Sequence, residues 1–334
     1  MLLRVTFGRI AGLLLCISPE AQEEIRLEWA FKHGLALRFR ITETNRLKEN
    51  PVKGANNHSD SRQSQEGVCK ESFVWRFEVR ELSDSGIARV AATCESAQVE
   101  VEEPAGGKLK FDSGQKKEPP RSSVLRMYHH LPGSTLELEI DRYGAIQNAK
   151  VIHWQVLEKL SRENAQTGGW WDAPFAVGWK SNKADDHAWL ALFDSIFRVS
   201  PQKAVRRGGR WSQVFDLQPA GGDGPARFEL EEQYECLGAK SMGKDPCLAL
   251  AVTSQIHLPS PTNVDAGPMR IKKESQGEGE ICFSADRGVL LALKRNLSFS
   301  AEWAISIHND QDGTDRVERV ERHIAHSLQV ELLK

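Results

Sequence analysis

Apolar and polar residues alternate along most of the chain. Over residues 25–44, apolar side chains fall at every second position on both sides of Gly34, and residues 73–93 repeat the pattern around a turn at 83–86. Alternation of period two, rich in aromatic and β-branched residues, is typical of strands with one buried face. We therefore predict antiparallel strands in both stretches. Residues 45–70 contain almost no large apolar residue, which predicts a mobile loop.

Further hairpins follow from the same pattern. Residues 135–152 predict two strands around the turn Asp141-Arg142-Tyr143-Gly144, and residues 279–293 predict a hairpin that turns at Asp286-Arg287-Gly288. A loop is expected at residues 238–246, between two long strands. The remaining predicted strands lie at residues 227–237, 247–258, 297–308 and 316–333.

The middle of the chain has a different periodicity. In residues 154–164 and 184–199, apolar side chains recur at intervals of three and four, which is typical of amphipathic helices. Between them, residues 168–183 are irregular and rich in tryptophan. The sequence therefore predicts a short helical segment between two β regions.

The order of elements also repeats. Each half has a strand that begins near a glycine, a long hairpin, a polar linker and a hairpin with an Asp-Arg-(Tyr)-Gly turn. We predict an α+β fold, predominantly antiparallel β, with two related curved β-sheet halves joined by a short helical, Trp-rich segment. The expected divisions are a signal peptide at 1–21, a first β half at 22–153, a helical connector at 154–200 and a second β half at 201–334.

The N-terminal residues follow the pattern of a secretory signal. Arg4 and Arg9 precede an uncharged apolar run at 10–17, and the small residue Ala21 offers a cleavage site. Leu15 before Cys16 does not suit a lipoprotein anchor. We expect an exported protein, periplasmic or extracellular; the alternative is a buried first element of a cytoplasmic protein.

Composition excludes some classes of function. The net charge is −2 and charged residues make up 27% of the chain, so no overall positive field would attract nucleic acid or an anionic membrane. No later stretch approaches the ~20 apolar residues that a membrane-spanning helix needs. We expect the mature chain to contain no transmembrane segment and to bind no nucleic acid.

Five of the six cysteines lie beyond the expected leader, and none forms a CxxC pair that would suggest zinc. Cys236 and Cys247 flank one predicted hairpin loop, which makes them the candidate disulfide. The alternative is that all five cysteines are small buried hydrophobic residues.

Several short motifs resemble a family of uncharacterised secreted bacterial proteins, a domain of unknown function, over most of the mature chain. Its markers here are Leu27-Glu28-Trp29-Ala30-Phe31 with Gly34 and Phe39, Lys110-Phe111-Asp112-Ser113, Asp141-Arg142-Tyr143-Gly144, and Pro201 with Gly208-Gly209-Arg210-Trp211. Arg210 departs from the acidic residue that the family pattern has there. The resemblance implies export and a β-rich fold, and it implies no catalytic residues. The layout is also similar to half-barrel lipoprotein carriers, as architecture only.

Motifs for catalysis, metals and nucleotides are weak. A phosphate-binding loop needs Ser or Thr after its lysine and a helix behind it, whereas Lys244 is followed by Asp245, Pro246 and a predicted strand. His129-His130 and Asp185-Asp186-His187 lack metal-ligand spacing. We therefore expect no metal and no cofactor, and we find no catalytic motif; a divergent hydrolase stays an alternative.

Tryptophan is concentrated in the middle segment. We hypothesise a concave apolar site for a lipid-like ligand, lined by Trp170, Trp171, Phe175 and Trp179. The alternative is that these rings fill the core. The function expected from the sequence is a non-catalytic envelope protein that binds an apolar ligand or another envelope component. The alternative to it is a structural module that contacts an envelope protein.

Overall fold

The computed structural model describes residues 24–51, 64–103, 106–115, 123–153, 186–217, 228–257, 269–309 and 314–334. Within these ranges, twelve strands form one antiparallel sheet and two helices accompany it. The elements are β1 (Ala36–Pro51), β2 (Gln65–Leu82), β3 (Ala88–Glu102), β4 (Lys108–Asp112), α1 (Ser123–His130), β5 (Thr135–Ile140), β6 (Ile146–His153), α3 (Asp186–Phe197), β7 (Arg210–Leu217), β8 (Phe228–Met242), β9 (Asp245–His257), β10 (Met269–Ser284), β11 (Val289–Asn309) and β12 (Thr314–Leu333).

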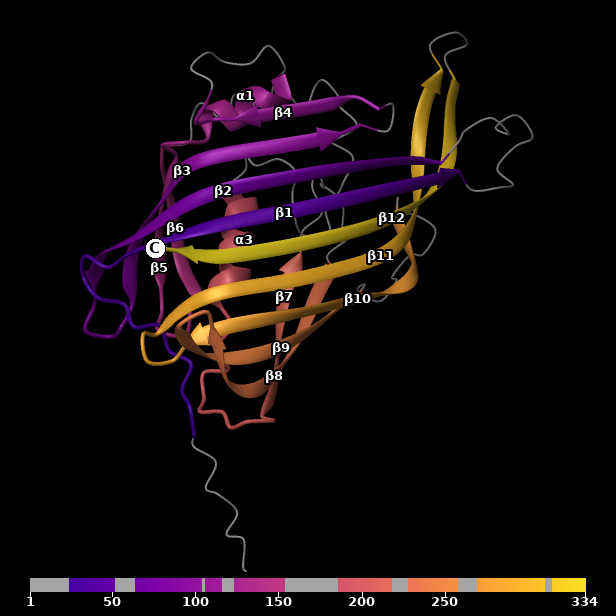
Figure 1. The fold of residues 1–334 in the computed structure, drawn as a ribbon. Coiled ribbons are helices and arrows are strands. Elements are labelled where there is room, and N and C mark those ends of the chain that lie inside the picture. The colour runs from indigo at the N-terminus through magenta and orange to yellow at the C-terminus, as the bar shows by residue number, and fades with distance from the viewer. Residues whose placement is uncertain are drawn as a thin grey trace, which may run out of the picture.

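The strands follow the order β6-β5-β3-β2-β1-β12-β11-β10-β9-β8-β7, and β4 pairs with β3. Nearly every strand therefore pairs with a neighbour in the sequence. There are two exceptions. β3 pairs with β5 as well as with β4, and β1 pairs with β12, a pairing that joins the first and last strands at the middle of the sheet. The sheet curves around α3, which crosses behind the strands in Figure 1.

Aromatic rings bind α3 to the apolar face of the sheet. Trp189 packs against Phe73 and Trp75, with ring centroids 4.9 and 4.7 Å apart. One and two turns further along α3, Phe193 and Phe197 both contact Phe77. All six rings are at most 3% exposed. Burying each ring contributes roughly 2 kcal/mol, so this contact holds the helix in place.

Both Asp-Arg-(Tyr)-Gly turns dock on the same N-terminal segment, around Trp29. The Trp29 amide donates to the Arg142 carbonyl at 2.8 Å, and the Ala30 amide donates to the Gly288 carbonyl at 3.0 Å. The Trp29 indole also donates to the carbonyl of Phe197 at the end of α3, at 3.0 Å. This segment therefore ties the two turns to the helix.

The structure confirms the predominantly antiparallel β fold and the predicted hairpins. It also confirms a helix within residues 184–199, now bounded as α3. The two related halves stay a prediction, because all described strands belong to one continuous sheet. The predicted helix at 154–164 and the Trp-rich stretch lie outside the described residues, as does the expected signal peptide.

Three local expectations were wrong. The loop expected at 45–70 is strand at both of its ends, because β1 continues to Pro51 and β2 starts at Gln65. The loop expected at 238–246 is a tight turn at Gly243-Lys244, since β8 and β9 pair up to Met242 and Asp245. Residues 25–35, where alternation predicted a strand, form only an isolated bridge at Ile25.

Replacing Gly144 by alanine should destabilise the fold more than the same change at Gly86. The two glycines have similar φ angles, +89° and +82°. A Cβ at Gly86 would meet nothing within 4 Å, whereas one at Gly144 would lie 2.8 Å from the Trp29 indole nitrogen and against the Phe197 carbonyl. We expect Gly86→Ala to lower the free energy of unfolding by about 1 kcal/mol and Gly144→Ala by about 2 kcal/mol more. Urea unfolding measures both; equal losses would contradict the docking role.

Candidate functional site: a polar trough across six strands

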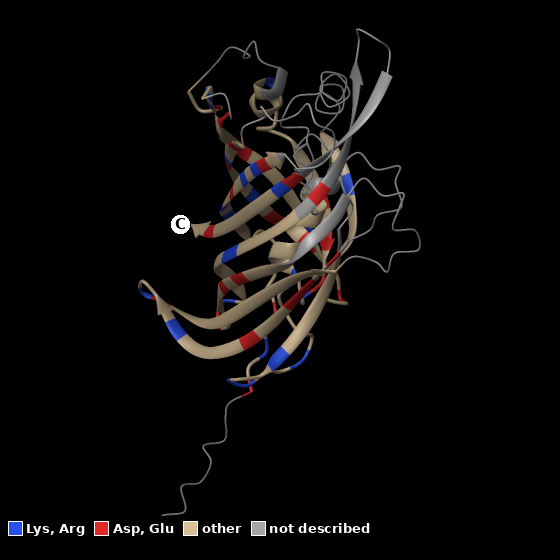
Figure 2. Cartoon of the chain, turned by 90° about the vertical axis from the view of Figure 1, so that its right-hand side faces the viewer, with Lys and Arg blue, Asp and Glu red and all other residues tan. Residues whose placement is uncertain are grey.

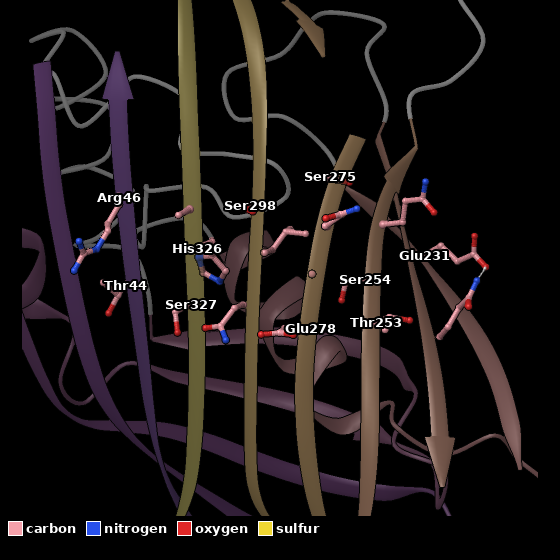
Figure 3. Close-up of a pocket in the computed structure, with 17 residues that line it drawn as sticks. Thr44, Arg46, Glu231, Thr253, Ser254, Ser275, Glu278, Ser298, His326 and Ser327 are labelled. Carbon is pink, nitrogen blue, oxygen red and sulfur yellow. Dashed lines mark hydrogen bonds between the residues drawn. The ribbon is translucent and has the colours of Figure 1, made fainter. Parts of the chain in front are cut away.

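A polar trough lies across the sheet on the face away from α3. Its volume is about 690 Å³, and its lining comes from β1, β12, β11, β10, β9 and β8 (Figure 3). At ~4.8 Å between neighbouring strands, six strands give it a length of roughly 24 Å. The lining residues are Thr44, Arg46, Glu231, Gln233, Thr253, Ser254, Gln255, Ser275, Gln276, Gly277, Glu278, Asn296, Leu297, Ser298, Ala325, His326 and Ser327.

The register of the strands assembles the trough from one side chain per strand. One residue on each of the six strands is paired with a residue on the next strand, so the six residues form a continuous row across the sheet. The row is Thr44, Ser327, Asn296, Glu278, Thr253 and Gln233. Side chains at every second position share a face, so these six all point to the same side of the sheet. The trough is therefore a product of register and cannot be seen in any single strand.

Hydroxyl and amide groups dominate the lining. Four lining residues are paired with one another in the row that faces α3, namely Ser254, Gly277, Leu297 and His326. Of the other thirteen lining residues, nine are uncharged Ser, Thr, Asn or Gln. The charged groups are separated: Arg46 comes from β1, while Glu231 and Glu278 come from β8 and β10. Glu231 is also held by His257, whose Nε2 lies 3.0 Å from its carboxylate. The trough can thus make many neutral hydrogen bonds along its length.

A second hollow of about 1270 Å³ adjoins the trough on the same face and shares Thr44 and Arg46 with it. Its walls carry cross-strand ion pairs, such as Lys110 with Glu100 at 2.9 Å. Lys110 lowers the pKa of the Glu100 carboxyl by a hydrogen bond and by its charge. Figure 2 shows residues of both charges interspersed along the strands. This part of the face is salt-bridged, unlike the hydroxyl- and amide-rich trough.

Directly behind the trough, the α3-facing side of the sheet carries buried ionisable groups. Arg295 on β11 pairs with Glu232 on β8 at 3.0 Å, and their side chains are only 7% and 1% exposed. The Tyr234 hydroxyl donates to the same carboxylate. Burial, followed by the charge of Glu232, raises the pKa of Tyr234 well above its usual value. Glu232 is thus held by a cation and a neutral donor.

Gly279 allows this pair to form. It lies opposite Arg295 on β10, between the strands that carry the two charges. A Cβ at this glycine would lie 3.0 Å from Cγ of Arg295 and would press on the neighbouring backbone. The absence of a side chain on β10 therefore leaves room for the arginine to reach towards β8.

The same buried row continues across β12, β1 and β2. His326 Nδ1 lies 2.7 Å from the Asn45 side-chain oxygen, and the Tyr128 hydroxyl donates to Glu71 at 2.7 Å. Arg322 donates to Glu49 at 2.9 Å. We call these groups, with the Arg295–Glu232–Tyr234 group, the buried polar band. At the level of the trough, both faces of the sheet are therefore polar.

Of the sequence-predicted site residues, the described structure contains only the two cysteines. Trp170, Trp171, Phe175 and Trp179 lie outside the described residues, so the apolar site stays a prediction. Cys236 and Cys247 are both free thiols. Cys236 lies opposite Leu250, on the α3 side, whereas Cys247 lies opposite Lys240 on the other face. A bridge between them is not formed here because they point to opposite sides of the sheet.

One contact has the form of a nucleophile with a base. The Ser300 hydroxyl lies 2.7 Å from Nδ1 of His323, on the neighbouring strand. A hydrolytic dyad also needs a group that orients the other side of the imidazole. Among the described residues, no carboxylate is recorded in contact with His323. The pair is a cross-strand hydrogen bond between β11 and β12.

No protein-family model matches the chain, and no curated protein matches its sequence. Among solved structures, lipovitellin is similar with a TM-score of 0.40 and 10% identity over 91% of this chain. The chain spans only 25% of that lipovitellin chain. OpdG of Pseudomonas aeruginosa has a TM-score of 0.21 at 8% identity, covering 89% of this chain and 98% of its own. A BenF-like porin of Pseudomonas fluorescens has a TM-score of 0.16 at 7% identity, covering 89% and 99%. With TM-scores this low, none of these likenesses supports an inference about function.

The resemblance to secreted proteins of unknown function gains no support from a family model, although the β-rich fold it implies is confirmed. In the part of the chain that the structure describes, no helix has the length and hydrophobicity to cross a membrane.

Replacing Arg295 by methionine should destabilise the protein strongly, because Glu232 would remain buried without its cation. We expect a loss of about 3–5 kcal/mol in the free energy of unfolding. The matched control is Arg210→Met, which removes an exposed partner of Glu235, with the arginine side chain 77% exposed. That change should cost less than about 1 kcal/mol. Similar losses in urea unfolding for the two variants would contradict the role of the buried pair.

The buried tyrosines should make the protein less stable in alkali. Burial raises the pKa of both Tyr128 and Tyr234 well above the usual value. A raised pKa in the folded state contributes stability that is fully present below about pH 10 and is lost as the pH rises further. We expect the free energy of unfolding to fall above pH 10, and to fall less steeply in a Tyr128→Phe/Tyr234→Phe variant. Parallel pH profiles for the two proteins would argue against this cause.

Proposed function

We propose that this protein is a non-catalytic binding protein whose trough holds a neutral, polyhydroxylated ligand, such as a segment of an envelope glycan. The observation that carries the proposal is the row of uncharged hydroxyl and amide groups across six paired strands. Such a ligand is one form of the envelope component expected from the sequence.

The composition of the trough favours this class of ligand over others. Hydroxyls and carboxamides both donate and accept hydrogen bonds, which matches the hydroxyl groups of a sugar. An anionic ligand would be repelled by Glu231 and Glu278. An apolar ligand would find only Ala325 among the lining side chains that point away from α3. A neutral polar chain of several units is the ligand that satisfies most of these groups.

The buried polar band supports binding by holding the trough in a fixed shape. Hydrogen bonds and ion pairs on the α3 side join β8 to β11 and β12 to β1, beneath the same strands that line the trough. A pre-formed site loses less conformational entropy when the ligand binds. The described strands carry no combination of nucleophile, base and acid. A rigid surface of this kind suits the binding of a ligand rather than its chemical conversion.

Export to the cell envelope, expected from the N-terminal residues, would place the trough where such glycans occur. A lipid-like ligand bound through Trp170 and Trp171 is the alternative that the sequence suggests. It would occupy a different part of the chain from the trough, so the two can be separated by experiment.

The test is calorimetry against neutral pentasaccharides of glucose and tetramers of N-acetylglucosamine. We expect binding to at least one of them, weakened roughly fivefold to tenfold by Thr253→Val or Gln276→Leu, because each change removes one or two hydrogen bonds. The control is Thr93→Val, since Thr93 bonds to Thr135 on β5 and is absent from the trough. No binding to any neutral oligosaccharide would overturn the proposal. A lipid found by native mass spectrometry, with no sugar binding, would support the alternative.

A further inference from the structure

Two thiols lie side by side on the trough face of β9 and β10. Cys282 on β10 is paired with Ala249 on β9, and Cys247 is two residues from that alanine. Residues two apart on a strand point to the same side, so Cys247 and Cys282 share a face as diagonal neighbours. Both belong to the strands that carry Thr253 and Glu278 into the trough, further along the sheet.

Both thiols are buried and interact with each other. As diagonal neighbours on paired strands, the two thiols influence each other electrostatically. They are only 8% and 6% exposed, although they lie on the solvent side of the sheet. Burial, reinforced by the neighbouring thiol, raises the pKa of Cys282 to about 12. Both cysteines are reduced in this structure.

An ion pair lies beside the thiols on the same face. Lys240 on β8 is directly opposite Cys247, and it binds Glu280, which is two residues before Cys282. The pair therefore spans from β8 to β10 across the strand that carries Cys247. Its side chains are about half exposed, at 51% and 45%. Movement of these two long side chains is the simplest way for a small molecule to reach the sulfur atoms.

We propose that Cys247 and Cys282 are a redox-active pair that forms a reversible disulfide between β9 and β10. The oxidant is a small-molecule disulfide of the glutathione type. The thiolate of one cysteine attacks it, forming a mixed disulfide and releasing one small thiol. The second cysteine, as its thiolate, then attacks the protein sulfur and releases the second small thiol. The protein loses two hydrogen atoms, and the oxidant is reduced to two thiols.

The diagonal placement favours reversibility. A disulfide needs Cβ atoms about 3.8 Å apart, whereas diagonal neighbours on adjacent strands are usually separated by more. Forming the bond must therefore shift the two strands slightly and store strain. Strained disulfides have higher reduction potentials, so they are reduced more readily than structural ones. This pair replaces the Cys236–Cys247 bridge expected from the hairpin, and it does not depend on the ligand of the trough.

The test treats the folded wild-type protein with graded ratios of oxidised to reduced glutathione. We expect the intact mass to fall by about 2 Da and non-reducing peptide maps to show Cys247 joined to Cys282. Because the cross-link closes a loop in the unfolded chain, Tm should rise by roughly 5 °C. Reduction with excess glutathione should reverse both changes.

Single variants identify the pair independently. Cys247→Ser and Cys282→Ser should lose the cross-link and accumulate a glutathione adduct on the remaining cysteine. Cys236→Ser is the matched control and should keep it, because this cysteine lies on the other face. A wild-type map with no cross-link, or with Cys236 joined to Cys247, would overturn the proposal.

Discussion

The packing of α3 against the sheet is the contact on which the rest of the structure depends. A single sheet must cover one apolar face to be stable in water, and here the aromatic rings of α3 cover its centre. Trp189 and Phe193 contact β2 at the centre of the sheet, beside the β1–β12 junction. The sheet therefore curves towards the helix, and its opposite face is left free for polar side chains.

The same covered face becomes polar further along each strand, and that change constrains the register. On β1, Ile41 is followed on the same face by Glu43 and Asn45, all of them buried. Replacing buried charges by well-packed apolar residues often stabilises a protein, so burial alone does not explain their presence. They do limit the possible pairings: a slip of one residue would turn the buried groups towards the opposite face. Arg295 reaches Glu232 only with Gly279 between them and with the observed curvature.

Much of the fold could be predicted from alternation, because a strand with one buried face shows its period in the sequence. The hairpins β5–β6 and β10–β11 and the helix at Trp189 are examples. The prediction from alternation failed at Asn45. The strand continues there, but its inward side chains are polar, so the sequence has the pattern of a loop. The trough could not be predicted, since Thr44, Asn296 and Gln233 meet only through pairings between strands far apart in the sequence. The Cys247 and Cys282 pair was missed for the same reason, because hairpin proximity favoured Cys236.

The trough and the thiol pair lie on the same face of β9 and β10, at different positions along the two strands. Thr253 and Cys247 are separated by six residues on β9, which at ~3.4 Å per residue places them roughly 20 Å apart. A bond between Cys247 and Cys282 would therefore leave the trough's lining groups free. It would instead fix the relative position of the two strands that carry Thr253 and Glu278. The thiols and the trough thus lie towards opposite ends of one β9–β10 ladder, whose register runs from Phe283 and Leu248 to Gly277 and Ser254.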